Sequence, residues 1–142
     1  TVLKPSSKFQ VLLVFPGFPI ATSWVYQNLK LKLTKRENNI SILRKNIYLS
    51  DISALGSQLY NHLEPVVIQR FPEIQVIKNQ LQTLGALGVL LSGSGSTVFG
   101  IFDNPDKAKV ACESLKGDWK RVVTETIGNF SEFCSEEILD YP

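Results

Sequence analysis

The stretch from Leu91 to Gly100, LSGSGSTVFG, constrains this chain more than any other segment, because Gly93 and Gly95 interrupt two apolar runs. Glycine adopts positive φ without steric cost, so the segment predicts a tight loop between two buried strands. Successive backbone N–H groups in such a loop can also converge on an anion. The residues alone leave two interpretations open, a hairpin turn and a cradle for a phosphate or diphosphate.

The length of 142 residues favours one domain, large enough to fold without a metal or disulfide. The net charge of +2 is too small to indicate nucleic acid, and no apolar run reaches the roughly 18 residues of a membrane span. The two cysteines and the single histidine, His62, lack metal-ligand spacing. We therefore expect no metal site, no nucleic-acid partner and no membrane partner. Because the chain begins at Thr1 and contains no methionine, we expect a piece of a longer protein.

Periodicity and capping signals predict four strands and several helices. The strands are expected at 9–15, 86–91, 96–102 and 119–126. The helices are expected to begin at Thr22 or Ser23 as N-cap, at Ser50 or Asp51, at Pro65, at Pro72 and at Asn104, the last packed by Ala108, Val110, Ala111 and Leu115. The helix from Ser50 or Asp51 is expected to run into residues 61–67 and to end or kink at Pro65. The helix from Pro72 has one apolar stripe, and Gly85 follows its end. This order predicts an α+β fold, a ferredoxin-like β-α-β-β-α-β two-layer sandwich with extra helices in the first crossover. We expect residues 1–126 to form the domain and residues 127–142 to form an acidic tail. The basic segment 30–36 is interpreted as a solvated surface, with phosphate contact as the alternative.

Motifs for common phosphate and catalytic chemistry are missing. No Gly-Lys-Ser/Thr follows Gly95, so the loop is not a Walker A motif, and Val98 occupies the third-glycine position of the dinucleotide fingerprint. The RNA-binding pattern lacks its basic residue, and no nucleophile motif or spaced carboxylate pair is found. No catalytic residue is therefore predicted in this chain. Asn61 and Glu64 lie at a helix junction and are interpreted locally as caps, with ligand contact as the alternative.

Three segments resemble a known family in their order along the chain. PGFPIATSWVY, 16–26, resembles the pattern P-x-x-x-(I/V)-S-T-x-x-x-Y, and NHLEPVV, 61–67, resembles N-D-L-E-P-V-V. LSGSGSTVFG, 91–100, resembles the third motif of the galactokinase, homoserine, mevalonate and phosphomevalonate (GHMP) kinase superfamily. Together they resemble the C-terminal half of the 4-diphosphocytidyl-2-C-methyl-D-erythritol kinase family, from about Phe9 to Thr126. His62 departs from the usual aspartate and Ala21 from the usual serine.

The resemblance implies a complete enzyme that transfers the γ-phosphoryl group of ATP, with Mg²⁺, to the 2-hydroxyl of 4-diphosphocytidyl-2-C-methyl-D-erythritol in non-mevalonate isoprenoid synthesis. The catalytic lysine and aspartate and the main ATP loop belong to an N-terminal domain expected upstream. This chain alone is expected to be inactive and to bind no cofactor. The enzyme is expected in the bacterial cytoplasm or the plastid stroma.

The resemblance also implies which residues of this chain contact phosphate or substrate. They are Gly93, Ser94, Gly95, Ser96 and Thr97 beside the phosphates, Thr22 and Ser23 near the substrate, and Asn61. The alternative function is a free-standing ferredoxin-like module that binds or senses a small molecule, because the sandwich pattern is complete within the chain.

Overall fold

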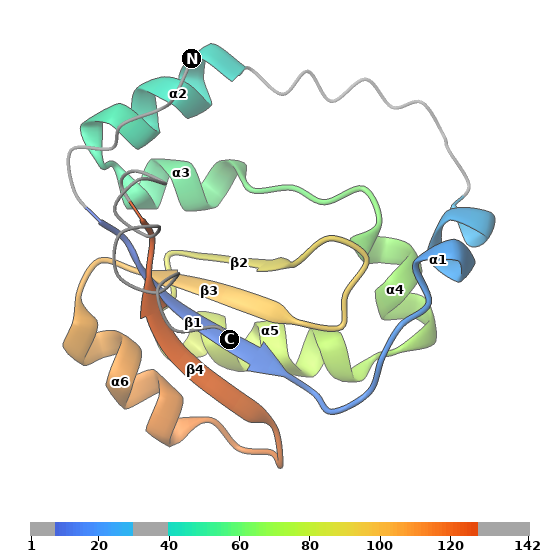
Figure 1. Cartoon of the computed structure of the whole chain (residues 1–142). Coiled ribbons are helices and arrows are strands. Elements are labelled where there is room, and N and C mark those ends of the chain that lie inside the picture. The colour runs from blue at the N-terminus through green and yellow to red at the C-terminus, as the bar shows by residue number, and fades with distance from the viewer. Residues whose placement is uncertain (1–7, 30–39, 128–142) are drawn as a thin grey trace, which may run out of the picture.

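The computed structural model describes residues 8–29 and 40–127, which contain a four-stranded sheet and six helices (Figure 1). In chain order the elements are β1 (Gln10–Phe15), α1 (Thr22–Asn28), α2 (Ile40–Leu49), α3 (Ile52–Gln58), α4 (Glu64–Arg70), α5 (Glu73–Thr83), β2 (Gly88–Leu91), β3 (Val98–Phe102), α6 (Pro105–Ser114) and β4 (Lys120–Glu125). The four predicted strands and the α+β class are confirmed. The basic segment 30–36 and nearly all of the acidic tail lie outside the described residues.

The strands form one antiparallel sheet in the order β2-β3-β1-β4. β1 is central and pairs with β3 so that Val14 lies opposite Val98. The end of β1 therefore meets the start of β3, directly beside the loop that joins β2 to β3 (Figure 1). This register brings the turn after β1, distant in sequence, to the glycine loop.

The larger core lies between the sheet and helices α5 and α6. Alternate residues of a strand point to the same face, and Leu12, Val14, Val98 and Phe102 are fully buried there. The helices contribute a second set of buried side chains, Ile74, Ile77, Leu81, Ala108 and Ala111. Burying one large apolar side chain stabilises a fold by about 1.5–3 kcal/mol, so this layer dominates the stability of the domain.

A second, smaller cluster covers the opposite face of the sheet. Phe9, Leu55 and Ile101 are its buried members, and side chains of α2 and α3 pack against them. Helix α3 approaches the start of β2 so closely that a Cβ on Gly56 would lie 2.0 Å from the Leu87 carbonyl oxygen, and glycine is therefore needed there. The two-layer expectation is therefore incomplete, since helices cover part of both faces. The sequence analysis did not predict α2, whose apolar side chains are spread around the helix rather than along one stripe.

Three local expectations need correction. The N-cap of α1 is Ala21, which provides no side-chain bond, so neither Thr22 nor Ser23 caps this helix. The helix that begins after Asp51 ends at Gln58 instead of running on to the α4 segment. Val110 is 60% exposed and does not pack α6. The cap at Asn104 is confirmed, since its side chain accepts bonds from Asp106 and Lys107 N–H.

None of the helices in the described ranges is both long and apolar enough to cross a membrane.

Arg121 of β4 holds the C-terminal end of α6. Its guanidinium donates to the carbonyl oxygens of Cys112 and Leu115, each at 2.9 Å, and to that of Gly117. The last carbonyls of a helix lack intrahelical partners and carry partial negative charge. One side chain therefore satisfies this helix end and ties α6 to the edge strand.

Replacing Arg121 should destabilise the domain through this helix end. Charge-assisted hydrogen bonds contribute about 1.5–3 kcal/mol, so we expect Arg121→Ala to lower the free energy of unfolding by about that amount, and Arg121→Lys by less. Urea unfolding measures the change, with the exposed neighbour Lys120→Ala as control. An equal loss in the two alanine variants would contradict the assigned role.

Candidate functional site

The glycine loop, residues 92–97, is a closed turn between β2 and β3. Ser92 N–H donates to the Thr97 carbonyl and Gly95 N–H donates to the Ser92 carbonyl, both at 2.9 Å. Gly93 has φ of +56° and Gly95 has φ of +89°, values that residues with a Cβ rarely adopt. The hairpin prediction is therefore confirmed, and glycine is required for the geometry at both positions.

The loop nevertheless leaves several backbone donors unused. Within the described part of the chain, the N–H groups of Gly93, Ser94, Ser96 and Thr97 donate no hydrogen bond. Backbone N–H groups are obligatory donors, and a run of them in a turn forms a site suited to an anion. The turn is therefore formed, and the anion cradle stays a prediction that these unbonded N–H groups support.

Asn61 positions the loop from the junction between α3 and α4. Its side-chain NH₂ group donates to the carbonyls of Leu91 at 3.0 Å and Gly93 at 2.7 Å. Its Oδ1 accepts from Leu63 N–H at 3.0 Å, which forms a turn ahead of α4. The N-cap of α4 is Leu63, without a side-chain cap bond, so the local capping interpretation is wrong for Asn61. Because both amide hydrogens are used inside the protein, Asn61 acts on the loop carbonyls and turns them away from any ligand.

Glu64 bonds to the backbone N–H of Leu91, the residue whose carbonyl Asn61 holds. Its Oε2 accepts from Leu91 N–H at 2.8 Å, while Oε1 pairs with the ammonium of Lys78 on α5. The two charged side chains are only 13% and 11% exposed. The sequence analysis missed this pair, although Lys78 interrupts the apolar stripe of α5 four residues after Ile74.

The turn after β1 closes the other side of the loop. The Ser96 hydroxyl donates to the Phe18 carbonyl, and Ser96 is 4% exposed, so its side chain is held inside the protein. The hydroxyl oxygens of Thr22 and Ser94 lie 2.8 Å apart at the surface. Ser23 is exposed and, within the described residues, makes no hydrogen bond to the loop. The structure thus brings Thr22 and Asn61 to the glycine loop but leaves Ser23 outside its network.

The two departures from the family pattern do not enter this network. Ala21 is the N-cap of α1, and its methyl group provides no cap. His62 is exposed and packs edge-on against Tyr60, with ring centroids 4.6 Å apart. The altered side chains therefore lie at the rim of the segments that hold the loop.

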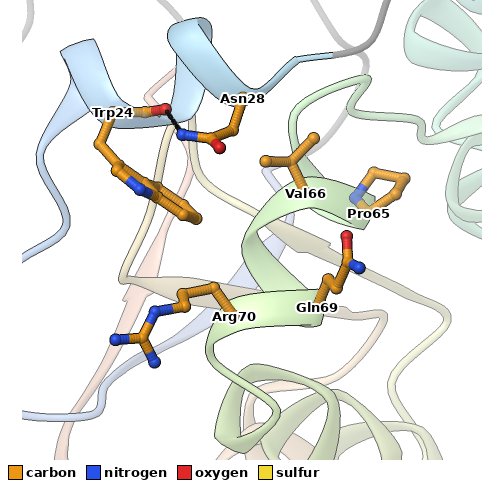
Figure 2. Close-up of a pocket in the computed structure, with 6 residues that line it drawn as sticks. All are labelled: Trp24, Asn28, Pro65, Val66, Gln69 and Arg70. Carbon is orange, nitrogen blue, oxygen red and sulfur yellow. Dashed lines mark hydrogen bonds between the residues drawn. The ribbon is translucent and has the colours of Figure 1, made fainter.

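A groove of about 540 Å³ runs between α1 and α4, the two helices that begin beside the loop (Figure 2). Trp24, Asn28, Pro65, Val66, Gln69 and Arg70 line it. Figure 2 shows the Trp24 indole and the Arg70 side chain directed into the space between the helices, with Asn28 donating to the Trp24 carbonyl. The groove contains none of the residues predicted to contact phosphate or substrate.

The described residues offer no acid, base or metal cluster at the loop. Within residues 8–29 and 40–127, no group of three or more His, Cys, Asp or Glu side chains could hold a metal ion. Both oxygens of Glu64 have partners inside the protein. The one pKa shift found in these ranges belongs to exposed Glu125 on β4, where a hydrogen bond from Lys8 and then its charge lower the pKa. The loop, residues 92–97, therefore holds no titrating group of its own.

Sequence comparison assigns the class of protein to which this arrangement belongs. A family model described as GHMP kinases C terminal matches residues 43–121, more than half of the chain. The chain belongs to the GHMP kinase C-terminal family. The fold agrees, since homoserine kinase from Cytophaga hutchinsonii superposes with a TM-score of 0.72 at 19% identity, over 90% of this chain and 44% of that one.

The more similar proteins share one particular name. The relatives from Acetivibrio thermocellus and Thermodesulfovibrio yellowstonii are named 4-diphosphocytidyl-2-C-methyl-D-erythritol kinase; they are 44% and 45% identical over 82% and 85% of this chain. The chain spans only 42% and 44% of those relatives. A crystal structure of 4-(cytidine 5'-diphospho)-2C-methyl-D-erythritol kinase superposes with a TM-score of 0.70 at 25% identity, over 88% of this chain and 45% of that one.

Removing the Asn61 side chain should release the loop. Asn61→Ala leaves two carbonyls without donors, and we expect a loss of about 1–3 kcal/mol in the free energy of unfolding. Asn61→Asp should be worse at pH 7, because a carboxylate would face the same two carbonyl oxygens. Urea unfolding gives the stability and amide hydrogen exchange gives the opening of the loop. The control is Gln69→Ala, which removes an exposed amide. Equal exchange at Ser92 and Gly95 in all variants would contradict the assigned role of the two Asn61 bonds.

Proposed function

We propose that this chain is the C-terminal half of an ATP-dependent kinase that phosphorylates the 2-hydroxyl of 4-diphosphocytidyl-2-C-methyl-D-erythritol. The observation that carries the proposal is the set of unused N–H groups in the glycine loop. The proposal is further supported by the family of the chain and by the name of relatives that are 43–45% identical to it. The glycine loop is then the part of this chain that contacts phosphate.

In this proposal the loop contributes fixed dipoles to phosphoryl transfer. The reaction breaks the bond between the γ-phosphorus and its bridging oxygen and forms a bond to the substrate hydroxyl, whose proton passes to a base outside this chain. Donors already aimed at the transferred group stabilise its charge without rearranging. The N–H groups of Gly93, Ser94, Gly95, Ser96 and Thr97 are the proposed loop donors, although Gly95 N–H would first have to leave the Ser92 carbonyl. The Thr22 and Ser94 hydroxyls face the substrate, with Ser23 and Asn61 as further contacts that experiment must test.

The glycine loop suits the phosphate groups of ATP but does not suit Mg²⁺. Phosphate oxygens match the unused N–H donors of the loop. Mg²⁺ prefers oxygen ligands that include carboxylates, and the described residues present no such set at the loop. The proposed enzyme therefore takes its Mg²⁺ ligands from the N-terminal domain, together with the catalytic residues.

We also propose that the sheet with α5 and α6 is a ferredoxin-like unit. The strand order, the antiparallel pairing and the position of both helices against the larger core support this description. The bacterial relatives favour the bacterial cytoplasm as the location of the enzyme.

A chimera tests the proposed function directly. The matched segment of the Acetivibrio thermocellus kinase, 118 residues long, is replaced by the corresponding segment of this chain. We expect the chimera to phosphorylate 4-diphosphocytidyl-2-C-methyl-D-erythritol with ATP, and this chain alone to show no transfer. A folded chimera without activity would overturn the proposal. Tight ligand binding and self-association by this chain alone would instead support the free-standing module.

The two loop glycines should respond differently to alanine in the chimera. A Cβ on Gly93 meets no atom within 4 Å, whereas a Cβ on Gly95 lies 3.0 Å from a Leu91 methyl and 3.1 Å from an Ile20 methyl. Gly95→Ala must therefore shift the loop, and we expect kcat to fall about 100-fold, as when a preorganised donor is lost. Gly93→Ala should cost less than tenfold.

Gly85→Ala is the matched control for backbone strain, because Gly85 has φ of +94° and lies at the end of α5 with no atom within 4 Å of its Cβ. We expect Gly85→Ala to lower stability and to leave kcat unchanged. Unchanged kcat in both loop variants would reduce the glycine loop to a turn.

A further inference from the structure

We propose that Glu64 is a positioning residue of the glycine loop, held in place by Lys78, and this inference rests on the proposed function. Glu64 reaches the loop through Leu91, the last residue of β2, whose N–H it accepts at 2.8 Å. Ser92, the next residue, already belongs to the loop. Glu64 therefore sets where the chain leaves the sheet.

This bond lies at the edge of the sheet, where it constrains the end of β2. Among the described residues β2 pairs with β3 alone, so one side of β2 has no strand partner there. An unpaired edge exposes N–H and C=O groups to water. At Leu91 both groups are occupied by side chains from the α3–α4 junction, the N–H by Glu64 and the C=O by Asn61. The strand end is thus bonded to side chains of helix α4 and its junction on one side and to β3 on the other.

Lys78 keeps the Glu64 carboxylate where it is. The side chains of Glu64 and Lys78 are 13% and 11% exposed, and an ionised group so buried is stable only while it is paired. Lys78 lies on α5 between the buried residues Ile77 and Leu81, inside the larger core. The loop is therefore connected to α5 by three bonded groups, Lys78, Glu64 and the Leu91 N–H.

Glu64 does not contact ligand itself in this arrangement. Each carboxylate oxygen has one protein partner, and the side chain is largely buried. Its effect must pass through the Leu91 peptide to the donors of the loop. Small misplacements of a reacting group lower the rate of a positioned reaction steeply, so a positioning role has a kinetic signature that a stabilising role lacks.

Two double variants isolate the bond to Leu91. Glu64→Gln with Lys78→Met removes both charges and keeps an oxygen acceptor for Leu91 N–H. Glu64→Met with Lys78→Met also removes both charges but leaves that N–H without an acceptor. The pair therefore differs in one hydrogen bond, and neither variant buries an unpaired charge.

Two measurements compare the pair. In the chimera, we expect kcat at saturating ATP to be at least about tenfold lower for the methionine double variant than for the glutamine one. In this chain alone, amide hydrogen exchange at Ser92 and Gly95, whose N–H groups are bonded within the loop, should be faster in the methionine double variant. If that variant does not fold, Lys78→Met alone decides, since it keeps the Leu91 acceptor but removes the partner that holds Glu64, and we expect both stability and kcat to fall.

Equal kcat and equal loop exchange in the two double variants would overturn the positioning role, as would an unchanged kcat in Lys78→Met. A chimera that is inactive with unsubstituted Glu64 would refute the proposed function instead. The exchange comparison in the isolated chain would then still decide whether Glu64 positions the loop.

Discussion

The structure depends on how the backbone N–H and C=O of one residue at the open edge of the sheet are satisfied. Leu91 ends β2, and a strand that ends at an edge leaves an N–H and a C=O without partners. Here Glu64 accepts the N–H and Asn61 donates to the C=O, so two polar side chains close the edge where the glycine loop begins. Because an unpaired buried polar group is costly, each of these bonds constrains the strand end strongly.

Hydrogen bonds to the rest of the protein also constrain the shape of the loop. The Gly93 carbonyl bonds to Asn61, and the Ser96 hydroxyl bonds to the turn after β1. The Gly93 carbonyl thus has a partner outside the loop, while four loop N–H groups donate no hydrogen bond within the described residues. Donors that are held in place before the charge develops are the property that electrostatic catalysis requires. The proposed kinase function relies on these N–H groups, and Gly95 N–H joins them only after leaving the Ser92 carbonyl.

Much of this arrangement could be predicted from the residues. The pattern of LSGSGSTVFG identified both the turn and its donors, and the order of three motifs identified the family. Helix α5 was predicted from Pro72, Gly85 and one apolar stripe, and the strands from short apolar runs. Helix α2 was missed because its apolar residues surround the helix, and the α1 cap was wrong because the hydroxyl of Thr22 bonds to Ser94 instead of to the helix.

The sequence by itself determined the local geometry, since positive φ at Gly93 and Gly95 and the helix start at Asn104 follow from side chains next to one another in the chain. Only the tertiary structure decided which distant groups meet. In the sequence Lys78 is one polar residue on a helix, and Glu64 is interpreted as a cap. Their roles appear only because α5 packs against the sheet and β2 ends beside Glu64. Hydrogen bonds and ion pairs form over about 3 Å, so their partners are set by packing and strand register rather than by spacing along the chain.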